Sequence, residues 1–286
     1  MINFSIPDFF FNFDLNVILL YLMENEKEKF YDDIKIDSIY GSFPCIWNGG
    51  RAINGGTHQI EMKKCIEYFN KKNISIRHTF TNSLLTEDDL RDHTGNLICK
   101  LSENSLNGIN VFSSLMYNYI KTNYPKFYLI WSTTLGEKNI DKINELSEKD
   151  LLVLDYNLNK DFKTLKKLKH PENVEILVNE ICVENCTFRQ KHYEFESNKQ
   201  LNLLSENFTC PHQVDLFYTN TVNRKHYITI NSIYHNYLDM GINKFKIMGR
   251  GRPLSEIIEY YVLYFVKPEY QNEIRQKLLI AIFESK

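Results

Sequence analysis

Four cysteines carry the strongest sign of chemistry in this sequence. Cys182, Cys186 and Cys210 lie close together late in the chain, whereas Cys45 lies near its beginning. Cys182 and Cys186 are four residues apart, so their thiols point the same way if this segment coils. Thiolate clusters with one remote ligand suit an iron–sulfur cluster or a structural zinc ion. The spacing alone leaves both a metal site and a set of unrelated thiols open.

The same spacing differs from two common metal motifs. The chain lacks the paired Cys-x₂-Cys knuckles of zinc ribbons. It also lacks a Cys-x₃-Cys-x₂-Cys triplet, because Phe188 and Arg189 occupy the region of the third thiol. The other two cysteines, Cys65 and Cys99, lie in apolar contexts and are interpreted as buried packing residues.

Composition sets broad limits on function. The chain has 286 residues, 43% of them hydrophobic, which is enough for a sizeable core. Its formal net charge of −2 argues against a global basic field for nucleic acid, although Arg250 and Arg252 form a local basic patch. No secretory signal and no long apolar run are visible, so we expect no membrane span. Six cysteines without a signal indicate a reducing cytoplasm.

The elements that must position the cysteines follow from the alternation of short apolar runs with helical patterns. Near-continuous apolar runs are typical of parallel strands covered by helices on both faces. The predicted strands are residues 4–10, 36–40, 74–80, 108–112, 127–132, 151–154, 174–179 and 244–248, with helical patterns between them. This order predicts a single (β/α)₈ TIM-like barrel over residues 1–286. A doubly wound open sheet is the alternative, but no Gly-x-Gly-x-x-Gly opens a helix.

One connection is too long for an ordinary loop of such a barrel. It follows the seventh predicted strand and spans about residues 181–225, with three of the six cysteines. Loops on the C-terminal face of a barrel commonly carry function. We therefore expect this insertion to lie beside the active site and to bring Cys182, Cys186 and Cys210 to the same face as Cys45.

Polar residues at the predicted strand ends are candidates for the site, because these positions line the pocket of a barrel. Arg51, Arg189 and Arg250 suit the binding of a carboxylate or phosphate, and Asn110 suits a polar substrate contact. Glu180 and His192 are candidates for proton transfer. For Arg189 and His192 the alternative is that they pack the insertion.

Several segments resemble the collagenase-like peptidase family (peptidase family U32), whose members are classed as peptidases of unknown catalytic type. The similar segments are residues 36–52 (IDSIYGSFPCIWNGGRA), 107–134, 175–193, 242–252 (INKFKIMGRGR) and 264–270. The resemblance covers most of the chain in order and implies a TIM-like barrel. The chain lacks a clear match to the long sequence signature that defines the peptidase name.

The resemblance also implies chemistry. One branch of the family carries out oxygen-independent hydroxylation with a 4Fe–4S cluster held by four cysteines. Carried over residue by residue, Cys45 matches the early ligand, and Cys182, Cys186 and Cys210 match the late group. This implies an iron–sulfur enzyme acting on a small organic or nucleobase substrate. Because members of this branch work in pairs, a paired subunit is also expected.

Two other classes of function stay open. A metal-free hydrolase would need a base beside a thiol, and Cys186 and His192 are close in sequence. A non-catalytic accessory protein would use zinc or a cluster only to hold the insertion in shape. Turnover, chelation and iron content discriminate among the three.

Overall fold

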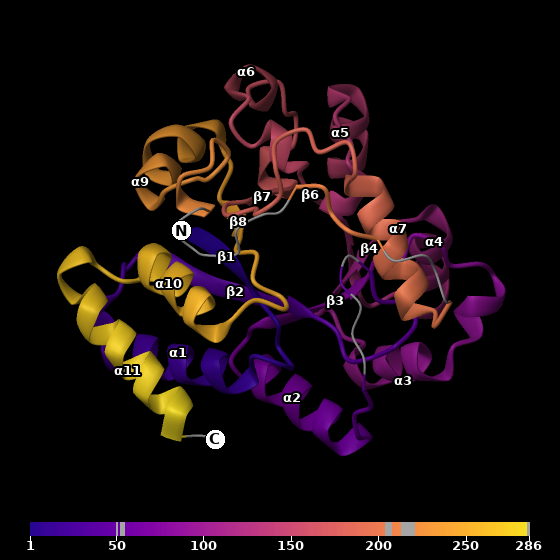
Figure 1. Cartoon of the computed structure of the whole chain (residues 1–286), viewed down its shortest axis with the longest axis horizontal. Coiled ribbons are helices and arrows are strands. Elements are labelled where there is room, and N and C mark those ends of the chain that lie inside the picture. The colour runs from indigo at the N-terminus through magenta and orange to yellow at the C-terminus, as the bar shows by residue number, and fades with distance from the viewer. Residues whose placement is uncertain (50, 52–54, 204–207, 213–220, 285–286) are drawn as a thin grey trace.

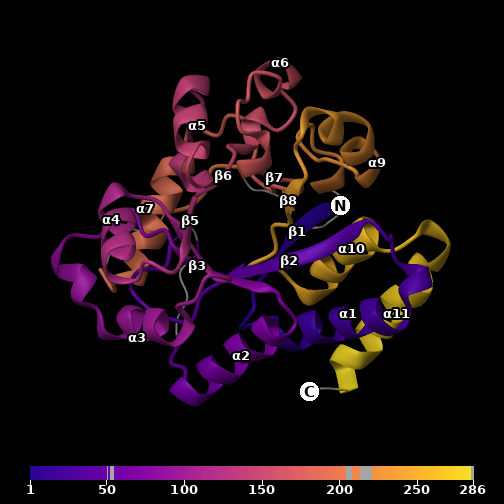
Figure 2. The same ribbon diagram turned by 180° about the vertical axis from the view of Figure 1, so that it is seen from behind.

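The computed structural model describes residues 1–49, 51, 55–203, 208–212 and 221–284. Eight parallel strands form a closed barrel in chain order, which confirms the predicted (β/α)₈ fold (Figures 1 and 2). All eight predicted strands are present, most of them shorter than expected. They are β1 (Ile2–Pro7), β2 (Ile34–Gly41), β3 (Ser75–Phe80), β4 (Gly108–Val111), β5 (Tyr128–Trp131), β6 (Leu151–Val153), β7 (Val174–Leu177) and β8 (Lys244–Lys246).

Helices surround the barrel. They are α1 (Phe13–Asn25), α2 (Gln59–Lys71), α3 (His93–Ser102), α4 (Ser114–Asn123), α5 (Ile140–Ser147), α6 (Phe162–Leu165), α7 (Arg189–Gln200), α9 (Ile230–Ser232), α10 (Leu254–Phe265) and α11 (Gln271–Glu284). Short 3₁₀ turns are η1 (Lys27–Lys29), η2 (Asp88–Arg91), η3 (Thr133–Leu135), η4 (Tyr156–Leu158), η5 (Pro171–Asn173), η7 (Leu238–Met240) and η8 (Pro268–Tyr270), and η6 (Ile233–Tyr237) is a π-helix. None of the described helices has the length and apolar character needed to cross a bilayer.

Two helices were not predicted from the sequence. α3 begins after Asp92, whose side chain accepts a hydrogen bond from the backbone of Gly95, and it carries Cys99 in its buried face. The short apolar run expected around Cys99 is therefore one face of a helix. α7 lies inside the insertion, where a loop was expected.

The apolar core lies between the outer face of the barrel and the helices. Phe4 on β1 packs against Phe245 on β8 and against Tyr264 and Phe265 on α10, with ring centroids 5.2 to 5.8 Å apart. α10 lies against the barrel and is covered in turn by α11, which also packs on α1 (Figure 1). This layering fixes β8 and β1 side by side and closes the barrel.

The inside of the barrel is polar, although barrel interiors are mostly filled by branched apolar residues. The Arg77 Nη1 atom on β3 lies 2.5 Å from Glu175 Oε1 on β7. β3 and β7 are not neighbours in the barrel, so this ion pair crosses the interior. Gly108 leaves room for the ring of Tyr128, since a Cβ atom there would lie 2.6 Å from two ring carbons.

Helix α7 crosses over the C-terminal end of the barrel, in front in Figure 1 and behind in Figure 2. Its first residue, Arg189, is tied to Asp155 after β6. Near its other end, the Ser197 hydroxyl accepts a hydrogen bond from the Ser83 backbone, and the Ser197 carbonyl accepts one from Asn82, both after β3. Helix α7 therefore forms a roof over one side of the barrel mouth.

Candidate functional site

A cavity of about 480 Å³ opens at the C-terminal end of the barrel, under α7. This is where barrel enzymes carry their active sites. Its lining combines strand ends with the insertion: Tyr40, Arg51, Thr79, Thr81, Asn110, Ser132, Thr133, Thr134, Leu177, Glu180, Ile181, Cys182, Arg189, His192, Tyr193, Cys210, His212, Lys246, Met248, Arg250, Gly251 and Arg252. Five basic side chains and one carboxylate are among them, so the cavity favours an anionic ligand.

Lys246 on β8 forms part of the floor. Its amine lies 3.8 Å from the centroid of the Tyr40 ring and 3.9 Å from Glu175 Oε2. Burial lowers the pKa of Lys246 to about 7, and the charges of Arg77 and Arg250 add to this effect while Glu175 opposes it. At neutral pH a substantial fraction of this amine is therefore uncharged and able to act as a base or nucleophile.

Arg250 follows β8 and reaches back over the cavity. Its guanidinium donates to Thr79 Oγ1 at 2.7 Å and to the Gly49 carbonyl at 3.3 Å. Burial lowers its pKa, and the nearby charge of Arg51 acts in the same direction. Asp8 is the carboxyl that opposes this shift, and burial raises the pKa of Asp8 itself while the charge of Arg250 lowers it.

Arg51 completes this basic pair. Its side chain passes beside Gly251, where a Cβ atom would lie 3.6 Å from both Cδ and Nη1 of Arg51. Among the described residues, no carboxylate lies at ion-pair distance from Arg51 or Arg250. The third arginine in this region, Arg252, is instead paired with Glu256 on α10. Arg51 and Arg250 are thus the cations that a ligand can neutralise.

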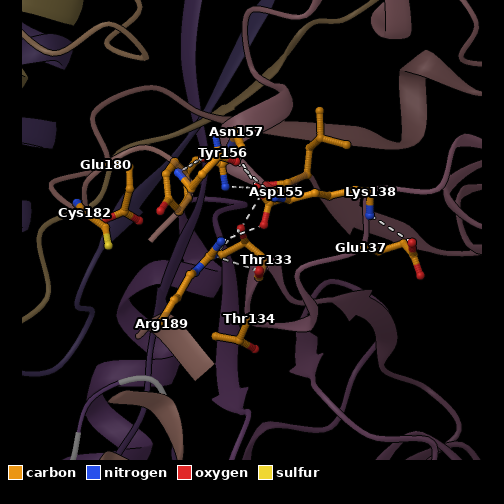
Figure 3. A network of polar contacts seen from close by, with 12 residues as sticks. Thr133, Thr134, Glu137, Lys138, Asp155, Tyr156, Asn157, Glu180, Cys182 and Arg189 are labelled. Atoms are coloured by element: carbon orange, nitrogen blue, oxygen red, sulfur yellow. Dashed lines mark hydrogen bonds and ion pairs between the residues drawn. The ribbon is translucent and has the colours of Figure 1, made fainter. Parts of the chain in front are cut away.

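The contacts of Arg189 favour the second of the two roles expected for it, packing of the insertion. Its guanidinium donates to Asp155 Oδ2 at 2.7 Å and to the Thr133 carbonyl at 3.0 Å (Figure 3). It also donates to the Tyr193 hydroxyl at 2.8 Å. It also lies 4.4 Å from the centroid of the Tyr156 ring. Every guanidinium nitrogen is therefore engaged, and these contacts support the alternative that Arg189 anchors the insertion to the barrel.

The two candidates for proton transfer lie at the cavity but in different settings. Glu180 accepts hydrogen bonds from the backbone of Ile181 and Cys182, at 2.8 and 3.0 Å, so its carboxylate orders the turn after β7. His192 is 47% exposed at its side chain, stacks on Phe208 and lies 3.7 Å from Glu196. His192 therefore lies at the mouth of the cavity, away from its floor.

Asn110 lies in the polar wall as expected. Its amide donates to the His78 carbonyl at 3.3 Å, and its Oδ1 atom is buried without a hydrogen bond among the described residues. The hydroxyls of Thr79, Thr81 and Ser132 line the same wall. These groups suit a substrate with several polar atoms.

The late cysteines reach the site only in part. Cys182 and Cys210 line the cavity, and Cys182 interacts with Cys186. Burial raises the pKa of the Cys182 thiol to about 12, opposed by its hydrogen bond with Tyr156. This environment favours the thiol over the thiolate.

Cys45 lies elsewhere, in the packing beneath α3. It is buried, the Asp92 and Cys99 side chains are close enough to interact with it, and burial raises the pKa of its thiol to about 12. The next aromatic residue, Trp47, is fully buried against Gly95 of α3. The loop after β2 therefore turns its cysteine outward to a helix, whereas the prediction placed it at the barrel mouth.

These positions do not fit a four-cysteine cluster. In the described ranges, no three Cys, His, Asp or Glu side chains are arranged to hold one metal ion. Cys45 is not among the described residues that line the cavity with Cys182 and Cys210. The four cysteines are therefore not gathered at one site among the described residues, as the sequence predicted for a 4Fe–4S cluster or zinc ion, and no reaction step is assigned to either.

The structure adds three site residues that the sequence analysis did not single out: Lys246, Tyr40 and Glu175. A signal for the lysine was present, because alternation along residues 244–248 places every second side chain inside a barrel. The sequence could not show that its partners Glu175 and Tyr40 come from β7 and β2.

Comparison with known proteins agrees with the fold. The sequence matches no family model and no curated protein. Among solved structures, the chain is similar to the U32 peptidase Mk0906, with a TM-score of 0.56 and 12% identity over 88% of this chain and 94% of that one. A GH113 β-1,4-mannanase aligns over 97% of both chains with a TM-score of 0.45 and 8% identity. At 12% identity, the likeness to the peptidase shows a shared barrel fold.

Proposed function

We propose that this chain is a TIM-barrel enzyme that binds a small organic anion in the cavity at the C-terminal end of the barrel. The observation that carries the proposal is the pair Arg51 and Arg250, which lie together at the cavity without a carboxylate at ion-pair distance in the described part of the chain. Both side chains are half-buried. Removing part of a cation from water without a carboxylate partner is unfavourable, and a bound carboxylate or phosphate offsets that cost.

The cavity also limits the size and character of the substrate. About 480 Å³ accommodates a small molecule or one nucleotide, and the wall offers Asn110 and several hydroxyls as polar partners. Lys246 supplies a proton-transfer or nucleophilic group on the floor, and Glu180 lies at the rim as a second candidate for moving protons. A nucleotide is also an organic anion, so a nucleobase substrate that carries a phosphate fits this proposal.

The test is ligand binding measured by thermal shift and calorimetry, with pyruvate, succinate and inorganic phosphate as probes. We expect at least one probe to bind, and Arg250→Met and Arg51→Met each to weaken it by about 10- to 100-fold, since a charge-assisted hydrogen bond contributes about 1.5–3 kcal/mol. Arg91→Met is the matched control, because Arg91 is exposed and lies outside the cavity. Binding that is unchanged in both cavity variants would refute the anion site.

The iron–sulfur reaction implied by the family resemblance is a second candidate, favoured by the interaction of Cys182 with Cys186 and by Cys210 in the same cavity. Anaerobic purification with iron and sulfide analysis tests it. Bound iron that is lost in a Cys182→Ser variant but kept in Cys45→Ser would assign it to the late cysteines. A colourless, iron-free protein prepared anaerobically would remove this candidate.

A further inference from the structure

The Lys246 amine is not needed as a counter-ion for the carboxylate beside it. The carboxylate nearest to it, Glu175, is already paired at 2.5 Å with Arg77, whereas Lys246 lies 3.9 Å from the other carboxylate oxygen. In the described ranges the amine donates no hydrogen bond, and its main contact is the face of the Tyr40 ring. Glu175 is thus neutralised without Lys246, and the lysine is a surplus cation.

The same amine is open to the cavity. Lys246 keeps 9% of its side-chain exposure and is one of the residues that line the floor. Lys246 Nζ and the Arg250 guanidinium lie over the same Tyr40 ring, 3.8 and 5.8 Å from its centroid. Both side chains line the same cavity, and the charge of Arg250 acts on the Lys246 amine, so one small ligand in the cavity faces both cations.

We propose that Lys246 forms a Schiff base with the carbonyl carbon of a small oxo acid whose carboxylate is bound by Arg51 and Arg250. This inference rests on the proposed anion site and names its substrate class. The Lys246 amine has two positive neighbours, Arg77 and Arg250, and one negative neighbour, Glu175. Burial lowers its pKa to about 7, so the reactive neutral form is available.

The step balances as follows in atoms and charge. The lone pair of the neutral amine attacks the carbonyl carbon and a C–N bond forms. One proton then moves from the amine nitrogen to the carbonyl oxygen, which gives a neutral carbinolamine. A further proton from solvent allows that oxygen to leave as water, which breaks the C–O bond. The products are one water molecule and a protonated imine on Lys246, which acts as an electron sink for bonds next to the former carbonyl carbon.

Reductive trapping on the intact chain tests the inference. The protein is incubated with glyoxylate and sodium cyanoborohydride, and labelled lysines are mapped by mass spectrometry. We expect Lys246 to be labelled about tenfold faster than Lys244, the matched lysine on the same strand, whose amine donates to the Glu172 carbonyl. Lys246→Arg should remove this labelling and Lys244→Arg should leave it unchanged. If Lys246 is labelled no faster than Lys244, the inference is overturned. This comparison uses the parent protein alone and needs no variant.

Neutral glycolaldehyde separates this inference from the anion site. If glyoxylate labels Lys246 faster than glycolaldehyde, and Arg250→Met removes the difference, both proposals are supported. If both aldehydes label Lys246 equally and Arg250→Met changes nothing, the Schiff base stands and the anion site fails. If glyoxylate binds in an Arg250-dependent manner but Lys246 is not labelled, the anion site stands and the Schiff base fails.

Discussion

The two ends of the barrel use arginine side chains in different ways. At the N-terminal end, beside a cavity of about 670 Å³, Arg77 is paired with Glu175 at 2.5 Å and with Asp37 at 3.6 Å. At the C-terminal end, Arg51 and Arg250 have no such partner among the described residues. The partnered cation at one end supports the fold, and the unpartnered ones at the other are available to a ligand. Lys246 lies between the two sets.

Removing the counter-ion at the N-terminal end should have the largest effect on stability. Glu175→Gln leaves Arg77 and Lys246 without their shared carboxylate inside the barrel. Breaking a buried pair in this way costs about 3 kcal/mol or more, measured by urea denaturation. The control is Glu67→Gln, which removes an exposed pair with Lys63 and should change stability by less than about 0.5 kcal/mol. A loss of under about 1 kcal/mol for Glu175→Gln would contradict the structural role of the pair.

Removing the charge of Lys246, which lies between the two ends, should increase the stability of the protein. Because the folded pKa of Lys246 is lowered from 10.5 to about 7, the unfolded chain holds the proton between these values while the folded chain does not. The free energy of unfolding of the parent should therefore rise as pH increases through this window. Below about pH 7 the buried charge is present in full and lowers the stability of the folded chain most.

Lys246→Met should accordingly be more stable than the parent by on the order of 2 kcal/mol near pH 6, and the advantage should shrink toward about pH 10. Denaturant melts across this range measure it, with Lys244→Met as the control. The groups that face Lys246 are Glu175, Arg77, Arg250 and Tyr40, so the same series in Glu175→Gln should show a larger penalty at low pH. A pH-independent difference would mean that Lys246 stays charged in the folded protein.

The smallest expected effect lies in the roof at the C-terminal end. Ser197→Ala removes the hydroxyl that joins α7 to Ser83 and should loosen the helix by about 1 kcal/mol, without altering the N-terminal ion pair. Amide hydrogen exchange in α7 measures this, with Lys199→Ala, an exposed position on the same helix, as the control. Equal exchange in both variants would show that the roof is held chiefly at Arg189.

Much of the cavity was predictable because strand ends of a parallel barrel meet at one face. Arg51, Asn110, Glu180 and Arg250 were expected at that face and all line the cavity. The same rule misplaced Cys45. The rule says that the loop after β2 begins at the C-terminal face of the barrel, but it does not say in which direction that loop turns. That direction depends on Trp47, whose indole nitrogen donates to the Asp89 carbonyl at 2.8 Å.

The alternation of apolar runs and helical patterns determined by itself that the chain forms eight strands with helices between them, because local periodicity decides which faces must be buried. Only the tertiary structure decided which charged side chains are paired. Glu175 is 98 residues from Arg77 in sequence, and their contact exists only because the closed barrel places β3 opposite β7. Charge neutralisation depends on distance in space, so only the closed barrel decides which cations lie beside a carboxylate and which do not.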